Sequence, residues 1–308
     1  MSKIIFGIDV GGTTCKCGTF SEEGELLRKE EIPTRKDEGG SLILPDISEY
    51  IKGVLADMNM TTEDVAGIGM GLPGACLEDG TVNKCINLGW GVFNAANALS
   101  ELTGIPVKIG NDANMAALGE FWVGGGSEYN SMVMVTIGTG VGGGVIIDGK
   151  PLYGFNGAAG EIGHLPLVEG ETESCNCGKK GCLEQVASAT ANRMLAESDM
   201  PSSLRSVPYI SAKVIFDEAK GGDALAIQVT EYVCRYLGKG LACAAGMVDP
   251  EVFVIGGGVS AAGEYFINLI DKYYKECVFH ASRQTKIVKA ALGNDAGMYG
   301  AAKLILGN

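Results

Sequence analysis

The sequence has no stretch rich in lysine or arginine, no long apolar run and only two histidines among its 308 residues. Its net charge is −13, which repels nucleic acid and anionic membranes, and no basic segment offsets this charge. Every apolar run ends well short of the roughly 20 residues that a membrane helix needs. The N-terminus passes directly into a strand pattern instead of a signal peptide, so we expect a cytosolic protein.

Several short motifs are also missing. The sequence contains no GxxxxGK[ST] phosphate loop and no C-x-x-C redox pair, and no linker rich in proline or serine separates its two halves. In a reducing compartment, the ten cysteines indicate buried thiols or metal ligands more than disulfides. The length predicts about two domains, and without a linker we expect them to pack closely across a cleft.

Strand and helix patterns alternate along the whole chain, which predicts an α/β fold. The apolar run "KIIFGIDV" ends at a glycine turn, and "TIGTG" (136–140) later takes the place of "DVGGT" (9–13), which suggests a duplicated fold. Further strands are expected at 65–70, 106–109 and 285–292. Helices are expected at 38–58, 94–103, 113–122, 183–198, 211–220, 223–247, 261–275 and 296–306.

Three glycine-rich turns follow predicted strands: "DVGGTT", "GTGVGGG" and "GGGVS". Glycine allows positive φ and close approach of the backbone to a ligand, and successive N–H groups in such turns can hold phosphate. Ordinary tight turns are the alternative. The candidate nucleotide-binding residues are Asp9, Gly11, Gly12, Thr13, Thr14, Lys16, Gly138, Thr139, Gly140, Gly257 and Gly258. Asp9 could hold Mg²⁺ and Lys16 could add positive charge. A nicotinamide enzyme is excluded, because "VIIDGK" continues as a strand where the dinucleotide fingerprint requires a helix.

Asp112, in "GNDAN", stands between a predicted strand and a predicted helix. The ordinary role of an aspartate there is to cap the helix. A carboxylate in this place could instead accept the proton of a substrate hydroxyl during phosphoryl transfer. Asn111 beside it could bind a sugar hydroxyl and fix the geometry.

The segment from Gly160 to Gln185 gathers one histidine and three cysteines. His164, Cys175, Cys177 and Cys182 form a Cys₃His set, which is a known tetrahedral zinc arrangement. A cysteine-rich loop with free thiols is the alternative. Four protein ligands leave no open position for water, so the zinc would be structural. Glu161 and Glu184, close to these residues in the sequence, are candidate acceptors for sugar hydroxyls.

The motifs "DVGGTT", "GLPG", "GNDAN", "TIGTGVGGG", "GEIGH", "CNCGKKGC" and "VIGGGVS" occur in this order. Together they resemble the ROK family of bacterial sugar kinases over nearly the whole chain. The resemblance implies a two-domain actin-like ATPase fold (ribonuclease H-like) with a zinc-stapled loop. It implies one lobe at 1–115 plus 295–308 and a larger lobe at 116–294.

The resemblance also implies roles for particular residues. Asp112 is the catalytic base, and His164 with the three cysteines binds Zn²⁺. The expected sugar-binding residues are Gly74, Asn87, Asn111, Asp112, Glu161, His164 and Glu184. Trp90 is expected in the core, as are Cys15 and Cys17, and His280 is expected at the surface.

An ATP-dependent hexokinase, most like a glucokinase, is the leading hypothesis, with MgATP on the glycine turns. Kinases of fructose, N-acetylmannosamine and allose share these motifs, and family members are commonly homodimers. A sugar-sensing repressor is the second hypothesis, but Asp9 leaves no room before it for a DNA-binding segment, and the charge is wrong for DNA. A sugar-binding protein without catalysis is the third, although Asp9 and Asp112 are both present.

Overall fold

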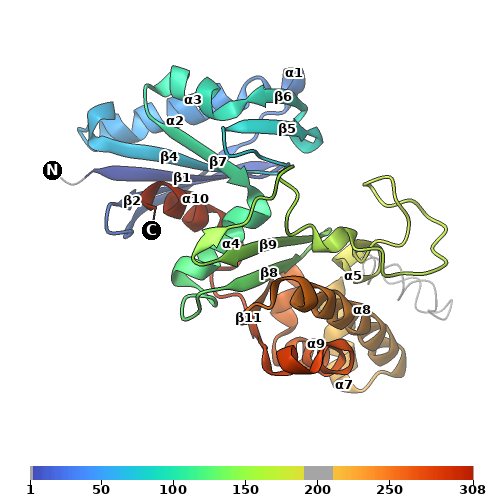
Figure 1. The fold of residues 1–308 in the computed structure, drawn as a ribbon. Coiled ribbons are helices and arrows are strands. Elements are labelled where there is room, and N and C mark those ends of the chain that lie inside the picture. The colour runs from blue at the N-terminus through green and yellow to red at the C-terminus, as the bar shows by residue number, and fades with distance from the viewer. Residues whose placement is uncertain (1–2, 191–210, 308) are drawn as a thin grey trace. The chain divides into compact units, whose positions relative to one another are not determined.

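The computed structural model describes residues 3–190 and 211–307, which form two compact units (Figure 1). The first unit comprises Met1–Glu128, Gly144–Gly160 and Asn294–Asn308, and the second comprises Tyr129–Gly143 and Glu161–Gly293. The lobes predicted from the sequence divide at residue 115, which falls inside a helix of the first unit. That division stays a prediction.

A five-stranded sheet forms the centre of the first unit, in the order β3-β2-β1-β4-β7. Its strands are β1 (Ile4–Val10), β2 (Thr14–Ser21), β3 (Leu26–Pro33), β4 (Val65–Leu72) and β7 (Val107–Asn111). β2 pairs antiparallel with both β1 and β3, while β4 pairs parallel with β1 and β7. The carboxyl ends of the three parallel strands therefore meet at one edge of the sheet.

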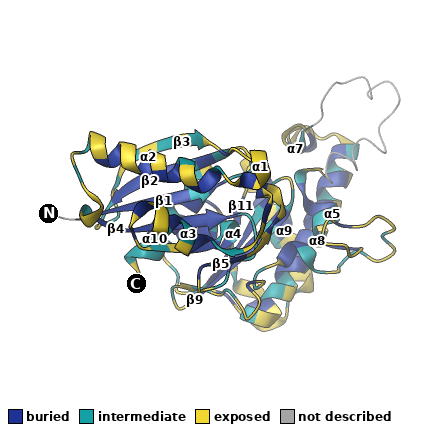
Figure 2. Ribbon diagram, turned by 90° about the horizontal axis from the view of Figure 1, so that it is seen from above, coloured by how far each residue is buried: buried dark blue, intermediate teal, exposed yellow. Residues whose placement is uncertain are grey.

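Helices cover both faces of this sheet, and the side chains of β1 show which helices pack on each face. Ile4, Phe6, Ile8 and Val10 belong to a core cluster with α2 (Ile43–Asp57) and α3 (Ala95–Thr103). Ile5 instead packs with α10 (Ala296–Leu306) on the opposite face, as period-2 alternation requires. Figure 2 shows the matching two-sided pattern on α2, which is buried toward the sheet and exposed outward.

Glycines let α10 lie directly on the sheet. A Cβ at Gly69 of β4 would meet the Ala301 carbonyl oxygen at 1.8 Å, and one at Gly7 of β1 would meet the Met298 carbonyl oxygen at 2.3 Å. α10 also packs against α4 (Asp112–Val123), where a Cβ at Gly300 would lie 1.7 Å from the Met115 carbonyl oxygen. Side chains at these glycines would force the elements apart.

The second sheet repeats the order of the first, as the repeated glycine turn predicts. Its order is β10-β9-β8-β11-β12. The strands are β8 (Met132–Ile137), β9 (Val141–Ile147), β10 (Lys150–Pro151), β11 (Val252–Gly256) and β12 (Lys286–Lys289). β8, β11 and β12 pair parallel, like β1, β4 and β7. β9 passes from the second unit into the first at Gly144.

Among its described residues, the second unit has the helices α5 (Glu184–Ala187), α7 (Ala212–Gly221), α8 (Ala224–Val248) and α9 (Glu264–Cys277). Side chains of Ser211 and Asp223 cap α7 and α8. The helix predicted at 183–198 is confirmed at 184–187, which form α5, but it is interrupted at Ser188, whose ψ is 161°. Residues 189–190 are helical again, and residues 191–198 lie outside the described ranges. The helix predicted at 261–275 begins later, because Gly258–Ala262 forms a 3₁₀ turn.

Two further differences from the predictions lie in the first unit. The helix predicted at 38–58 is divided into α1 (Asp37–Gly40) and α2, because Glu38 and Gly39 have φ of 52° and 69°. A small hairpin of β5 (Thr81–Cys85) and β6 (Trp90–Asn94) was not predicted. Among the described residues, no helix combines the length and apolar character needed to cross a membrane.

Candidate active site

The turn between β1 and β2 is tight, and it leaves free space beside one glycine, Gly12. The Gly11 N–H donates to the Thr14 carbonyl at 3.0 Å, and the Thr34 N–H donates to the Thr13 carbonyl at 2.8 Å. Apart from their chain neighbours, no described atom lies within 4 Å of the Cβ positions of Gly12, Gly138 and Gly258, one in each glycine turn. Each turn therefore has a place where a ligand can approach the backbone.

Asp9 is the last residue of β1 whose side chain faces α10. A Cβ at Gly297, in the first turn of α10, would lie 2.7 Å from the Asp9 carboxyl carbon. Burial raises the pKa of Asp9 to about 6, against the opposing effect of Lys16, while Asp295 raises it further. Lys16 is the cross-strand neighbour of Asp9, and its Nζ donates to the Asn294 carbonyl at 2.5 Å. Asp9 is thus a carboxylate that lost much of its hydration on folding.

Asp112 is the first residue of α4, and Asn111 is the N-cap. The Asn111 Oδ1 accepts from the N–H groups of Ala113 and Asn114 at 3.0 and 3.2 Å. The cap role considered for Asp112 therefore belongs to its neighbour. Asp112 Oδ1 accepts from the Ala113 N–H at 2.8 Å, which orients the carboxylate at the start of the helix.

Asn111 also connects this helix to the loop after β4, because its Nδ2 donates to the Gly74 carbonyl at 3.1 Å. Cys85 Sγ donates to the neighbouring Pro73 carbonyl at 2.8 Å. Burial raises the pKa of Cys76 to about 12, and the charge of Asp112 contributes to this rise. The sequence interpretation did not include these two cysteines, although both lie close to "GLPG" in the chain.

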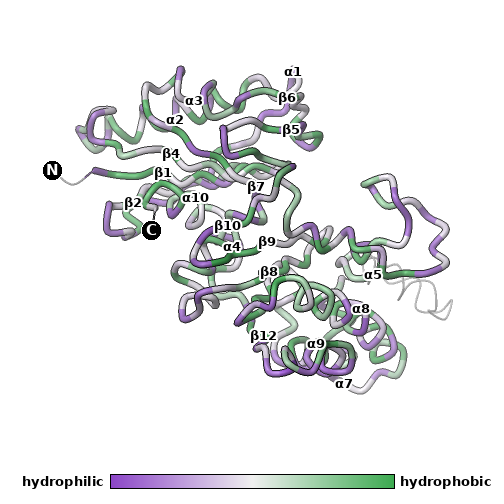
Figure 3. The backbone as a smooth tube through the Cα atoms, viewed as in Figure 1, coloured by the Kyte–Doolittle hydropathy of each residue, from purple (hydrophilic) through white to green (hydrophobic). Residues whose placement is uncertain are grey.

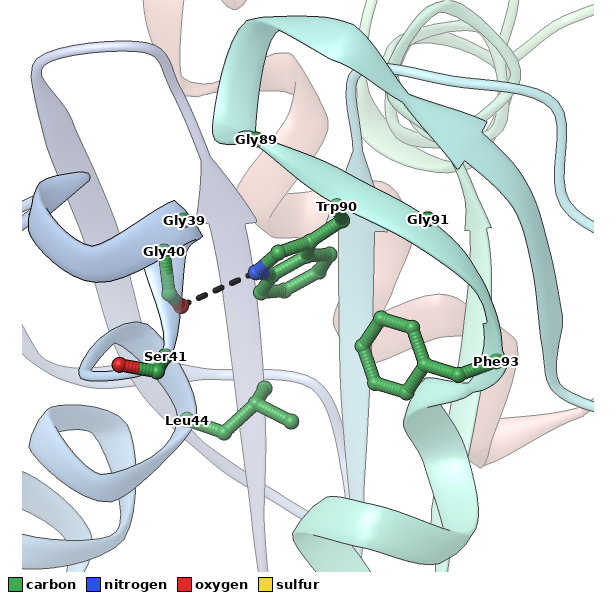
Figure 4. Close-up of a pocket in the computed structure, with 8 residues that line it drawn as sticks. All are labelled: Gly39, Gly40, Ser41, Leu44, Gly89, Trp90, Gly91 and Phe93. Carbon is green, nitrogen blue, oxygen red and sulfur yellow. Dashed lines mark hydrogen bonds between the residues drawn. The ribbon is translucent and has the colours of Figure 1, made fainter.

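Trp90 is 7% exposed, so the prediction of a core position is confirmed. Its Nε1–H donates to the Gly40 carbonyl at 3.0 Å, and its ring lines a hollow of about 250 Å³ (Figure 4). The hollow is lined by Gly39, Gly40, Ser41, Leu44, Gly89, Trp90, Gly91 and Phe93, none of them a predicted site residue. Asn87, a predicted sugar contact, is exposed on the same hairpin. Cys15 and Cys17 are buried in the core and His280 is exposed, as expected.

The other two glycine turns meet in the second unit. The Gly138 N–H donates to the Gly140 carbonyl at 2.9 Å, which closes the β8–β9 turn. A Cβ at Gly257, whose φ is 83°, would lie 2.3 Å from the Ile137 carbonyl oxygen. Of the glycines predicted to bind nucleotide, Gly257 is the one with positive φ. Positive φ therefore does not explain the other glycines of this set, which corrects that part of the reason given for them.

His164 and the three cysteines converge as the spacing predicts. Their ligand atoms all lie within 4.8 Å of one another. Cys175 Sγ lies 3.7 Å from His164 Nδ1, and Cys177 Sγ lies 3.5 Å from Cys182 Sγ. Tetrahedral zinc with bonds of about 2.3 Å to sulfur and 2.0 Å to nitrogen separates its ligands by about 3.5–3.8 Å. The four residues therefore fit a metal ion of this kind.

The loop that carries the cysteines is largely hydrophilic and lies before α5 (Figure 3). Gly178 and Gly181 have φ of 85° and 80° and turn the chain between the cysteines. The Lys179 N–H is the main cause of a lowered pKa at Cys177, whereas burial raises the pKa of Cys182 to about 12. With few apolar residues to bury, the loop depends on its backbone hydrogen bonds and on the cluster.

Glu161 and Glu184 lie on either side of this cluster. Glu161 Oε2 is 3.9 Å from His164 Nε2, the ring nitrogen that faces away from Cys175. Glu184 Oε2 accepts from the Val141 N–H at 2.9 Å, and its Oε1 lies 3.9 Å from Cys175 Sγ. The sequence did not predict that Glu184 would contact the β8–β9 turn.

Comparison with known proteins identifies the family. The ROK family profile matches residues 5–308. The chain belongs to the ROK family. A glucokinase of Halalkalibacterium halodurans is 40% identical to it, over 97% of this chain and 94% of the relative. A ROK hexokinase from Thermus thermophilus superposes with a TM-score of 0.82 at 32% identity, covering 97% and 96% of the two chains. A ROK glucokinase from Streptomyces griseus, solved with glucose and AMPPNP, gives 0.79 at 32% identity, covering 98% of each chain.

In this ROK chain, each unit gathers its own share of the predicted site residues. The first unit holds Asp9, Gly11, Gly12, Thr13, Thr14, Lys16, Gly74, Asn87, Asn111 and Asp112. The second holds Gly138, Thr139, Gly140, Glu161, His164, Cys175, Cys177, Cys182, Glu184, Gly257 and Gly258.

Asn294, Asp295 and Gly297, all close to Asp9 or Lys16, were missed in the sequence. A signal for them exists, because "GNDA" occurs at 110–113 and again at 293–296. The first copy ends β7 and opens α4, and the second lies after β12 and opens α10. The repeat thus marks equivalent strand-to-helix junctions of the two sheets.

Proposed function

We propose that this ROK protein is an ATP-dependent hexokinase that phosphorylates the 6-hydroxyl of a hexose, with glucose as the first candidate. The observation that carries the proposal is the carboxylate of Asp112, oriented by the Ala113 N–H at the start of α4. Its neighbour Asn111 ties that helix to the Gly74 loop. The glucokinase relative at 40% identity and the glucokinase solved with glucose and AMPPNP support the same activity.

The proposed reaction needs one proton acceptor on the protein. The sugar O6 forms a bond to the γ-phosphorus while the bond between that phosphorus and the β–γ bridging oxygen breaks, releasing ADP. The proton of the 6-hydroxyl moves to the Asp112 carboxylate. Such general-base assistance contributes about 10²–10⁴ in rate, and much of the remaining catalysis comes from positioning and electrostatic stabilisation.

The nucleotide phosphates are proposed to lie on the glycine turns, where Gly12, Gly138 and Gly258 leave room beside the backbone. Thr13, Thr14, Thr139 and the remaining glycines of these turns would provide N–H and hydroxyl donors. Bound Mg²⁺ would neutralise phosphate charge during transfer. Asp9, charged above pH of about 6, is the residue proposed to help hold it, and Lys16 adds positive charge beside it.

The metal ion proposed for the Cys₃His cluster is structural zinc, with His164 Nδ1 as the nitrogen ligand. The ring's other nitrogen, Nε2, would then carry a fixed proton and donate to a sugar oxygen. Glu161, near that nitrogen, is a proposed acceptor for a sugar hydroxyl. Gly74, Asn87, Asn111 and Glu184 are the other proposed sugar contacts.

We further propose that the protein is cytosolic, in keeping with its acidic composition. We also propose that it is a homodimer, as members of the ROK family commonly are. Light scattering coupled to size-exclusion chromatography tests the dimer, with a mass of twice 32.0 kDa expected.

A coupled ADP-release assay tests the function. The zinc-loaded protein is given MgATP with glucose, mannose, fructose, allose, N-acetylglucosamine or N-acetylmannosamine. The largest kcat/KM is expected with glucose. Preference for another of these sugars would keep the reaction and change the substrate. Silence with every sugar would contradict a kinase and favour a sugar-binding protein without catalysis.

A further inference from the structure

The β8–β9 turn rests on the segment that directly follows the last cysteine. Glu184 accepts from the Val141 N–H at 2.9 Å, and the Ala189 N–H donates to the Gly138 carbonyl at 2.8 Å. Thr190 Oγ1 lies 3.5 Å from the Thr139 carbonyl oxygen. Residues 184–190 therefore contact the turn at both of its ends and at its centre.

Glu184 fits the turn closely. A Cβ at Gly140 would lie 2.2 Å from the Glu184 Oε2, so the carboxylate occupies the space that any side chain at that position would need. A charged acceptor holding a backbone N–H forms a stronger hydrogen bond than a neutral one. The orientation of the Val141 N–H, and of the turn before it, thus depends on where Glu184 lies.

The position of Glu184 is set in turn by the segment from His164 to Cys182, here called the metal-binding loop. It is two residues after Cys182, whose N–H donates to the Gln185 side chain at 3.0 Å. The Glu184 Oε1 lies 3.9 Å from Cys175 Sγ. The Leu183 N–H donates to the Leu165 carbonyl at 2.9 Å, next to His164. A metal ion that fixes His164 and the cysteines would therefore fix the start of α5 as well.

We propose that Glu184 is a positioning residue through which the metal-binding loop sets the shape of the β8–β9 turn. This inference rests on the proposed function, in which the β8–β9 turn binds the nucleotide phosphates, so the shape of the turn affects nucleotide affinity. Loss of the metal then weakens nucleotide binding, and not only the sugar contacts near His164. The coupling runs through side-chain and backbone contacts of one segment, residues 182–190.

Amide hydrogen exchange of the whole protein, without sugar or nucleotide, tests the coupling by itself. Exchange of the Gly138–Gly143 peptide is compared in zinc-loaded protein, in protein treated with a zinc chelator, and in Glu184→Ala. We expect faster exchange of this peptide after either change, while β1–β2 peptides stay as before. Unchanged exchange of the turn in Glu184→Ala, whose melting temperature shows that it is folded, would overturn the proposal.

Nucleotide affinity gives a second readout, measured by calorimetry with AMPPNP and Mg²⁺ in the absence of sugar. Glu184→Ala is expected to weaken binding about tenfold, the size of a lost charge-assisted hydrogen bond. Glu184→Gln should recover part of the affinity, because its amide oxygen can accept the Val141 N–H. Glu169→Ala, at an exposed glutamate between His164 and Cys175, is the matched control and should leave AMPPNP affinity unchanged.

Chelation should weaken AMPPNP binding more in the wild type than in Glu184→Ala, because the two changes act through one path. Equal losses in both proteins would contradict the coupling. Failure of the proposed function would look different: no sugar would be phosphorylated, yet exchange of the turn would still respond to the metal and to Glu184→Ala.

Discussion

At the residue scale, the two aspartates proposed to act in phosphoryl transfer occupy different environments. Asp9, on β1, is partly buried beside the first turn of α10, and loss of hydration there raises its pKa to about 6. Asp112 is half-buried at the first position of α4, with Asn111 as the cap that frees it from that role. The carboxylate of Asp9, with its raised pKa, is thus suited to hold a cation, and that of Asp112, at the start of a helix, to meet a substrate hydroxyl.

Asp112→Asn is expected to fold normally and to lower kcat by about 10²–10⁴-fold, because the amide cannot accept the hydroxyl proton. The Ala113 N–H can still bond to the amide oxygen, so the start of α4 keeps its geometry. Steady-state kinetics and thermal unfolding measure the two effects. Asp148→Asn, in the turn at the opposite end of β9 from Gly140, is the control and should keep full activity. Near wild-type turnover in Asp112→Asn would remove this residue from the mechanism.

Asp9→Asn should make the protein more stable at neutral pH while impairing nucleotide-dependent activity. The folded-state pKa of about 6 lies above the ordinary value of 3.8, so the ionised carboxylate opposes folding. That cost is absent below pH of about 4, grows as pH rises toward 6, and reaches up to roughly 3 kcal/mol above it. Urea unfolding of both proteins between pH 4 and 8 measures it. A difference that stays flat with pH would contradict the assigned pKa.

The positions of single residues were predictable from the sequence where a motif fixed their neighbours. The Cys₃His set converges as its spacing indicated, and the buried positions of Cys15 and Cys17 follow from strand alternation. The contact between Glu184 and Val141 was not predictable, because it joins residues 43 apart through a fold that the spacing does not reveal.

At the element scale, the crossing of α4 and α10 depends on glycine. Gly300→Ala should lower the free energy of unfolding by about 3 kcal/mol or more, since the new methyl group meets the Met115 backbone. Gly53→Ala, on the exposed face of α2, is the matched control, because no described atom lies near its Cβ position apart from its own helix and chain neighbours. It should stabilise by about 0.5–1 kcal/mol through helix propensity. Equal effects of the two substitutions in denaturant unfolding would contradict this packing.

The metal-binding loop leads to a prediction about the metal content of the purified protein. The purified protein is expected to contain one zinc per chain by elemental analysis. Cys182→Ser should lose the metal and melt at a lower temperature, because a thiolate ligand inside the cluster is removed. Cys243→Ser, at an exposed thiol of α8, should keep both the metal and the melting temperature. Protein that folds fully without zinc, and binds none when it is supplied, would contradict the site.

Helices with clear end signals were predictable, and those set by local backbone strain were not. α3 lies where the pattern placed it, between the Asn94 cap and Gly104 in the left-handed region. The helical pattern is broken before α2 by positive φ at Glu38, Gly39 and Gly40, which periodicity does not register. The β5–β6 hairpin was missed because its strands are short and Lys84 also has positive φ.

At the scale of the whole molecule, two sheets share one strand order, and a glycine turn follows the first strand of each. The sequence indicated this duplication through "DVGGT" and "TIGTG", and more clearly through the two copies of "GNDA". Between the copies the functional residues have diverged: Asp112 is the proposed base, whereas Asp295 contacts Lys29 at 2.7 Å and raises the pKa of Asp9. Identical topology therefore carries different chemistry at its two strand-to-helix junctions.

The central claim is the transfer of the γ-phosphoryl group of ATP to the 6-hydroxyl of a hexose. Phosphorus NMR of the product formed from glucose and MgATP tests it most directly. The account predicts a phosphate monoester coupled to the two protons on C6, formed in equal amount with ADP and lost in Asp112→Asn. ADP released with inorganic phosphate alone, or a phosphate on another carbon, would contradict it.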